Sequence, residues 1–110
     1  MGRLIEFRAD AGTFPPSLAV EVGDVLMFGA TGGHVRSGAD AVEMMGAFQT
    51  GVLADDGRIL TPMGAPGTVL FRARCPGRAT IDVITGDPWQ AAQSTLLELA
   101  VAAPSSRACD

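Results

Sequence analysis

The chain of 110 residues lacks three residue types altogether, because it contains no lysine, no asparagine and no tyrosine. The codons of all three are AT-rich, so their absence indicates a GC-rich, bacterial genome and carries no functional meaning. Without asparagine, the chain has no N-glycosylation site. Its eight basic residues are arginines that occur singly, and the formal net charge is −4. This distribution excludes the basic stripe of a nucleic-acid-binding protein.

Long hydrophobic runs are also lacking, and none approaches the ~20 residues that span a bilayer. Arg8 and Asp10 interrupt the region where a secretory signal would be apolar. We therefore expect a cytoplasmic protein without a membrane partner. Hydrophobic residues nevertheless make up 47% of the chain and charged residues only 18%, which excludes general disorder. The length suits one domain over residues 1–103, with a flexible polar tail over residues 104–110.

Cysteine is scarce, and two residues do not make a disulfide framework. Cys109 falls in the expected tail, so pairing with Cys75 is not favoured in a reducing compartment. Alternation in "GTVLFRARC" places Cys75 on the same face as Phe71, which predicts a buried cysteine that behaves as a small hydrophobic residue.

What the chain does contain is period-2 alternation of apolar and polar residues, separated by turns rich in Pro, Gly and Asp. The one hint of a helix is "DAVEMMGAF", where Gly46 argues against a long one. Asp55, Asp56 and Gly57 predict a hairpin turn. The pattern predicts an all-β fold, an antiparallel sandwich of about seven to eight strands. The clearest strands lie within 4–9, 17–22, 25–30, 67–75, 79–85 and 95–101.

Apolar residues also fall on the second face of several of these strands. They are Leu26, Leu70, Ile84 and Leu96. A second apolar face implies that something covers it. We therefore expect a homodimer that forms through sheet faces or paired edges.

The segment "GTFPPSLAVEVGDVLMFGATGGHV" resembles the N-terminal half of a cupredoxin, through Phe14, Pro16, Val20, Gly23, Asp24, Val25, Phe28 and His34. In this resemblance Cys75 occupies the place of the copper-binding cysteine. A type-1 copper site also needs a second histidine, usually with a methionine. The sequence continues "PGRATIDVITGDPW" and contains neither. The resemblance thus implies a cupredoxin-like Greek key that has lost its copper site, with His34 and Cys75 close together.

The rhythm "F-R-A-x-x-PG-x-A-T-I" is similar to that of bacterial Ig-like domains and of chagasin-type protease inhibitors. The "GDPW" segment with Trp89 is similar to the Arg-Pro-Trp loop of those inhibitors, whereas their N-P-T-T-G loop has no counterpart. Fold similarity alone does not transfer an activity.

His34, the single histidine, lies in the expected loop "GATGGHVRSG", where two glycines precede it. One interpretation makes it a metal ligand, with Cys75 or with a methionine from Met44, Met45 and Met63. A second makes it the general base of a small enzyme, oriented by Asp40 or Glu43. A third, which we favour, is a loop histidine whose ring nitrogens bond backbone carbonyls or water. Methionine is more often a filler of apolar gaps than a ligand.

The sequence therefore favours a non-enzymatic binding or accessory module. Its recognition surface would consist of the loops Gly29–Gly38 and Thr85–Gln90, with His34, Arg36, Asp87 and Trp89 meeting an unknown small molecule or protein. No cofactor is expected. Copper bound by His34 and Cys75 is the alternative, and an enzyme that uses His34 is a second alternative.

Overall fold

The computed structural model of the chain describes residues 2–7, 14–49, 51–60, 67–86 and 92–103. These residues contain ten strands and no helix. None of them therefore forms a helix that could cross a membrane. The strands are β1 (Leu4–Phe7), β2 (Ser17–Glu21), β3 (Val25–Phe28), β4 (Gly32–Ser37), β5 (Val42–Phe48), β6 (Val52–Leu53), β7 (Ile59–Leu60), β8 (Thr68–Ala73), β9 (Gly77–Thr85) and β10 (Gln93–Ala102).

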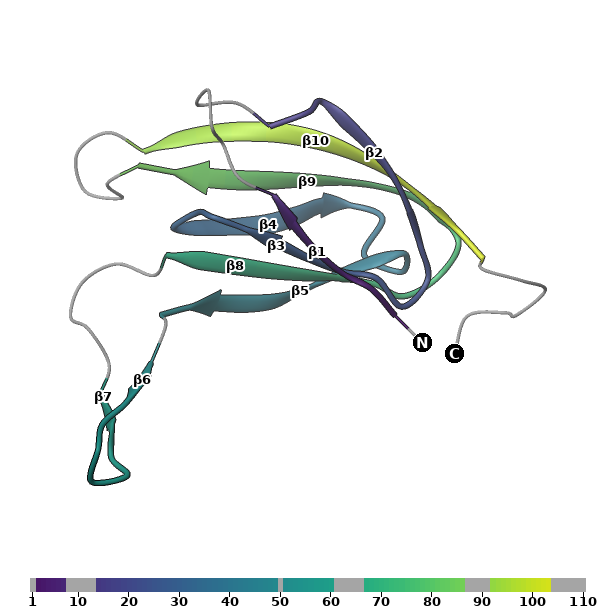
Figure 1. Cartoon of the computed structure of the whole chain (residues 1–110). Helices are drawn as coiled ribbons and strands as arrows, with labels where there is room; N and C mark the ends of the chain where they lie inside the picture. The colour runs from purple at the N-terminus through teal and green to yellow at the C-terminus, as the bar shows by residue number, and fades with distance from the viewer. Residues whose placement is uncertain (1, 8–13, 50, 61–66, 87–91, 104–110) are drawn as a thin grey trace.

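Eight of these strands form two sheets that pack face to face (Figure 1). One sheet has the order β1-β3-β8-β5 and the other the order β2-β10-β9-β4, while β6 and β7 pair only with each other. This confirms the predicted all-β sandwich. The pairing is antiparallel except at one edge of each sheet, where β1 runs parallel to β3 and β2 runs parallel to β10.

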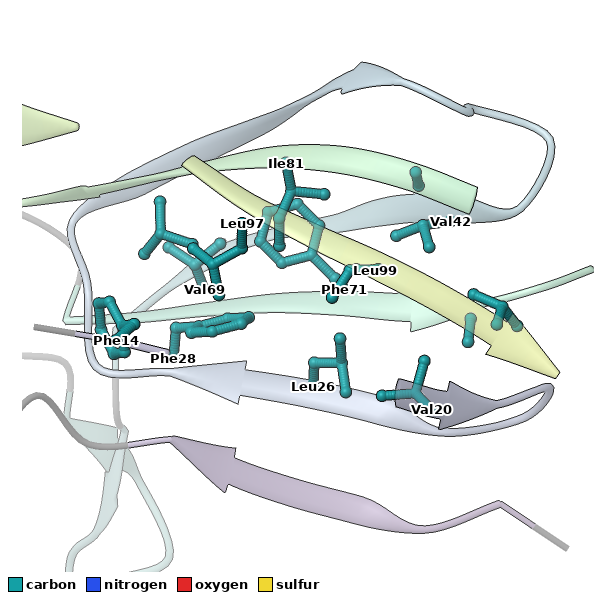
Figure 2. Close-up of a cluster of buried hydrophobic side chains, with 14 of the residues drawn as sticks. Phe14, Val20, Leu26, Phe28, Val42, Val69, Phe71, Ile81, Leu97 and Leu99 are labelled. Atoms are coloured by element: carbon teal, nitrogen blue, oxygen red, sulfur yellow. The ribbon is translucent and has the colours of Figure 1, made fainter. Parts of the chain in front are cut away.

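The core lies between the two sheets and is centred on aromatic rings (Figure 2). Phe28 stacks on Phe7 with 4.9 Å between the ring centroids, and it meets Phe14 and Phe71 edge-on at 5.3 and 5.8 Å. The facing sheet contributes Ile81, Val83, Leu97 and Leu99. The predicted inward residues of β8, β9 and β10 are therefore correct. Leu26 is fully buried beside this cluster, so its assignment to the outer face was wrong: it shares the inward side of β3 with Phe28.

Two sequence predictions about local structure were also wrong. Residues 32–37, expected in a loop, form β4, which pairs with β9. The segment that hinted at a helix forms β5, whose register with β8 shifts between Met44 and Gly46. Gly46 has a φ of +146°, which other residues rarely adopt. An extra residue at this bulge interrupts the two-residue alternation, and this imitates a helical spacing in the sequence.

The turn between β2 and β3 is fixed by Asp24, whose side chain is only 2% exposed. Arg3 donates from Nε to Oδ1 at 3.0 Å and from Nη2 to Oδ2 at 2.6 Å. The backbone N–H of Glu21 also donates to Oδ2, at 2.9 Å. The Arg3 hydrogen bonds are the main reason that the pKa of Asp24 lies below its usual value, against the opposing effect of burial. The residue that matched a cupredoxin motif therefore has a structural role.

Candidate functional site

Three pairs of strand ends lie at the same end of the sandwich: the end of β3 with the start of β4, the end of β5 with the start of β8, and the end of β9 with the start of β10 (Figure 1). The predicted recognition loops Gly29–Gly38 and Thr85–Gln90 belong to the first and third of these. Only Gly29–Thr31 and Gly38 of the first loop lie outside a strand. The structure adds the second pair, which the sequence had not suggested as a site.

The β3–β4 turn is tied to the end of β9 by Thr31. Its backbone N–H donates to the carbonyl of Ile84 at 2.8 Å. Its hydroxyl lies 3.1 Å from the same carbonyl oxygen and 3.1 Å from that of Gly86. On its other side, the N–H of Gly29 in this turn donates to the carbonyl of Phe7 at 3.3 Å. The backbone entering the Trp89 segment is therefore held against the β3–β4 turn.

The β6–β7 hairpin projects from this end of the molecule (Figure 1). Val52 pairs with Leu60, and Leu53 pairs with Ile59. The turn between them has Gly57 at a φ of +89° and an ion pair of 2.7 Å between Arg58 and Asp56. This confirms the predicted hairpin turn at residues 55–57.

Exposed apolar side chains are grouped on the hairpin and on the neighbouring end of β5. Within the described residues there are eight exposed large hydrophobic side chains, and six of them lie between residues 45 and 60. These six are Met45, Phe48, Val52, Leu53, Ile59 and Leu60, with exposed fractions from 44% to 68%. Grouped exposed hydrophobic residues mark a contact surface for another molecule.

His34 lies on the outer face of the β2-β10-β9-β4 sheet. Its Nε2 is 2.9 Å from Oδ2 of Asp82, its cross-strand partner on β9. Arg36 Nε lies 2.5 Å from the same oxygen. The Asp82 side chain is 4% exposed, whereas those of His34 and Arg36 are 56% and 59% exposed. The two basic side chains thus cover a carboxylate that would otherwise be open to solvent.

The local backbone explains this arrangement. The register of β4 against β9 shifts between Val35 and Ser37, so that Arg36 is the extra residue of a bulge and is free to turn toward Asp82. The glycine before His34 is required by space: a Cβ at Gly33 would lie 2.6 Å from the Asp82 carbonyl oxygen and 3.1 Å from the ring of Phe71. Gly33 therefore permits a close approach of β4 to β9, in a segment that the sequence predicted to be a loop.

The carboxylate beside His34 is therefore Asp82 and not Asp40 or Glu43. Glu43 instead forms an ion pair of 2.5 Å with Arg72 on the outer face of the first sheet. Asp82 lies on the outward side of β9, between the inward Ile81 and Val83. Sequence reasoning could not pair it with His34, because the contact joins residues far apart in sequence and depends on β4 being a strand.

The proposed metal ligands are not brought together. Cys75 precedes β9, whereas His34 lies opposite Asp82, well beyond the start of β9 at Gly77. The distance along β9 from Gly77 to Asp82 is about 16 Å at the usual rise per residue of a strand. Cys75 is 9% exposed, as expected for a buried residue, but it is disulfide-bonded, so the expectation that it stays unpaired was wrong; Cys109 lies outside the described residues. No group of three or more potential His, Cys, Asp or Glu ligands occurs in the described part of the chain.

The remaining predicted residues divide into two groups. Met44 packs against the core and Met45 is 46% exposed, in agreement with the preference for core or interface over a metal site. Asp87, Trp89 and Met63 lie outside the described residues, so their roles stay predictions. Thr31 and the apolar hairpin were missed. The two short apolar runs "VL" and "IL" on either side of Asp55–Gly57 could have indicated a hairpin of two strands that are too short to join either sheet of the sandwich.

No protein-family model and no curated protein sequence matches this chain. Among solved structures, the chain is similar to a cysteine protease inhibitor from Entamoeba histolytica, with 9% sequence identity and a TM-score of 0.55. The similarity covers 91% of this chain and 96% of that protein. At this identity it shows a shared fold. It favours the inhibitor-type sandwich over the cupredoxin as the structural relative.

Proposed function

We propose that this domain is a non-enzymatic module that binds another protein with the end of its sandwich. The binding surface consists of the β6–β7 hairpin, the β3–β4 turn and the connection from β9 to β10. The observation that carries the proposal is the exposure of Val52, Leu53, Ile59 and Leu60 on one projecting hairpin. Exposed apolar side chains that are grouped in this way mark an interaction site for another protein.

The neighbouring turn supports the proposal through its rigidity. Thr31 makes three hydrogen-bonding contacts to the end of β9, which hold the turn and the start of the Trp89 segment in one arrangement. A surface ordered before binding loses little conformational entropy when its partner arrives. This favours recognition of a preformed cleft.

The partner class that fits best is a cysteine protease. The structural relative is an inhibitor of cysteine proteases. Such a partner offers an open, partly apolar cleft, which suits a projecting apolar hairpin flanked by two turns. Inhibitors of proteases are also typically rigid at the contact surface before they bind.

The disulfide at Cys75 bears on where this partner would be met. Disulfides persist in oxidising compartments and are rare in the cytoplasm. This observation supports an oxidising compartment over the cytoplasmic location expected from the sequence.

The proposal is tested by titrating papain, a cysteine protease, and trypsin, a serine protease, with the intact protein. We expect residual papain activity to fall saturably, with trypsin unaffected. Equal loss of both activities would indicate a non-specific effect. No loss of papain activity at micromolar protein would contradict the assignment of the partner class.

A further inference from the structure

The outer face of the β2-β10-β9-β4 sheet carries charges of opposite sign on its two halves. The exposed arginines stand on β4 and β9, and they are Arg36 and Arg78. The acidic side chains, Glu98 and Glu21, stand on β10 and β2. Two of these charges are already matched within the chain: Arg36 lies against the buried carboxylate of Asp82, and Nη2 of Arg3 is 3.7 Å from Oε2 of Glu21.

Arg78 and Glu98 carry the remaining charges of this face. Arg78 lies opposite Ala100, and Glu98 lies opposite Thr80, so the two are diagonal neighbours on adjacent strands. Both are exposed, and neither forms an ion pair with another described residue. A hollow of about 400 Å³ lies between them, and its lining also includes Ser17, Ala19, Thr80 and Ala100. Leu96 is 52% exposed and lies on the same side of β10 as Glu98.

We propose that this face binds the same face of a second copy of the chain, with a two-fold axis parallel to the strands. Rotation about such an axis keeps the position along the strands and exchanges left and right. Because the strand order is β2-β10-β9-β4, this rotation places β9 and β4 of the second copy over β10 and β2 of the first. The basic half of each copy then meets the acidic half of the other, and the interface is self-complementary.

In this arrangement each Arg78 reaches Glu98 of the other copy, which lies at the next outward position along the strands. The contact occurs twice because the interface is symmetric. The hollow between the two charges leaves room for these long side chains between sheets that pack at about 10 Å. Exposed Leu96 is covered at the same time.

The available area suits a weak dimer. Four strands spaced at about 4.8 Å make a face about 19 Å wide, and an average strand length of about 25 Å gives roughly 500 Å² in projection. Two copies would bury about 1,000 Å², at the lower limit for a specific interface. We therefore expect association in the micromolar range that weakens with added salt, because exposed charges are screened.

The test is sedimentation of the full chain and of two charge-reversal variants. Concentrations from about 1 to about 200 µM bracket micromolar association. We expect the wild type to change from monomer to dimer over this range. Arg78→Glu and Glu98→Arg should each remain monomeric, because each places like charges in contact. An equimolar mixture of the two variants should dimerise again, since the introduced glutamate of one copy and the introduced arginine of the other form a pair of opposite charge. The second contact of this mixed dimer joins the original Glu98 and Arg78.

Arg74→Glu is the matched control, because it makes the same charge change at an exposed position outside this face. It should dimerise like the wild type. Circular dichroism of each variant establishes that it is folded. The proposal is overturned by a wild type that stays monomeric at the highest concentration, by variants that dimerise alone, by a mixture that does not associate, or by loss of the dimer in the control.

Discussion

Arg3 and Asp24 meet in a two-pronged ion pair, in which Nε and Nη2 of the arginine each bond a different oxygen of a carboxylate that is 2% exposed. This contact holds the start of the chain against the β2–β3 turn. The backbone N–H groups of Arg3 and Glu21 donate to the same carboxylate at 3.3 and 2.9 Å. Asp24 thus accepts four hydrogen bonds, two at each carboxylate oxygen, which compensate for its burial.

The first prediction follows from the lowered pKa of Asp24, whose main cause is its hydrogen bonding to Arg3. Because the pKa is lower in the folded state, the stabilisation is fully present above the unfolded value near 3.8 and is lost as pH falls through the folded value. We expect Asp24→Asn to lower the free energy of unfolding at neutral pH by about 1–3 kcal/mol. Urea melts from neutral to strongly acidic pH would measure this.

Its control is Asp56→Asn, which removes an exposed ion pair in the hairpin turn. Exposed pairs contribute at most about 1 kcal/mol, so this variant should change stability little and keep the pH dependence of the wild type. A pH dependence that survives unchanged in Asp24→Asn would assign the acid sensitivity to another group.

The second prediction concerns the register of β8. Phe71 is fully buried against Phe28, whereas Arg72 points outward to Glu43. We expect Phe71→Ala to lower the free energy of unfolding by about 3–5 kcal/mol. Arg72→Ala should cost no more than about 1 kcal/mol. Urea melts that gave the opposite order would show that the inward face of the strand is misassigned.

The third prediction separates the two partners of Asp82. A guanidinium stays charged at every accessible pH, so Arg36→Ala leaves a buried carboxylate with only the imidazole beside it. We expect a loss of about 1–3 kcal/mol in the free energy of unfolding. His34→Ala should cost less than about 1 kcal/mol, because Arg36 remains. Equal losses in thermal melts at mildly alkaline pH would mean that the imidazole is as important as the guanidinium.

The fourth prediction concerns copper. A blue site needs a thiolate and two imidazoles around one ion. Here the single imidazole and Cys75 are separated along the sheet, and Cys75 is disulfide-bonded. We expect Cu²⁺ to produce no intense visible absorption band. A strong blue band that disappears in both His34→Ala and Cys75→Ala would restore the copper hypothesis.

Much of the fold could be predicted from local alternation, because one buried face per strand repeats every two residues. The inward positions of Phe71, Ile81 and Leu99 are examples. Alternation fails where a bulge adds a residue, which explains the wrong predictions around Arg36 and Gly46. Parallel pairing of β1 with β3 leaves no local pattern, since it depends on which distant strands become neighbours.

The candidate site was harder to predict for the same reason. His34 was conspicuous as the only histidine, yet its partner Asp82 is distant in sequence. The apolar hairpin was not conspicuous, because Leu53 and Ile59 look like core residues when their exposure is unknown. Exposure is a property of the packed molecule, and a sequence of apolar residues does not reveal which of them the fold leaves outside.

The central claim is that the apolar hairpin binds a cysteine protease, and a pair of leucine substitutions tests it most directly. Leu53 on the hairpin and Leu4 on β1 are 68% and 66% exposed, so Leu53→Ser and Leu4→Ser remove the same side chain from equally exposed positions. In papain titrations we expect Leu53→Ser to weaken inhibition at least about tenfold, as for an interface anchor. Leu4→Ser should inhibit like the wild type. Equal inhibition by the wild type and Leu53→Ser would contradict the account.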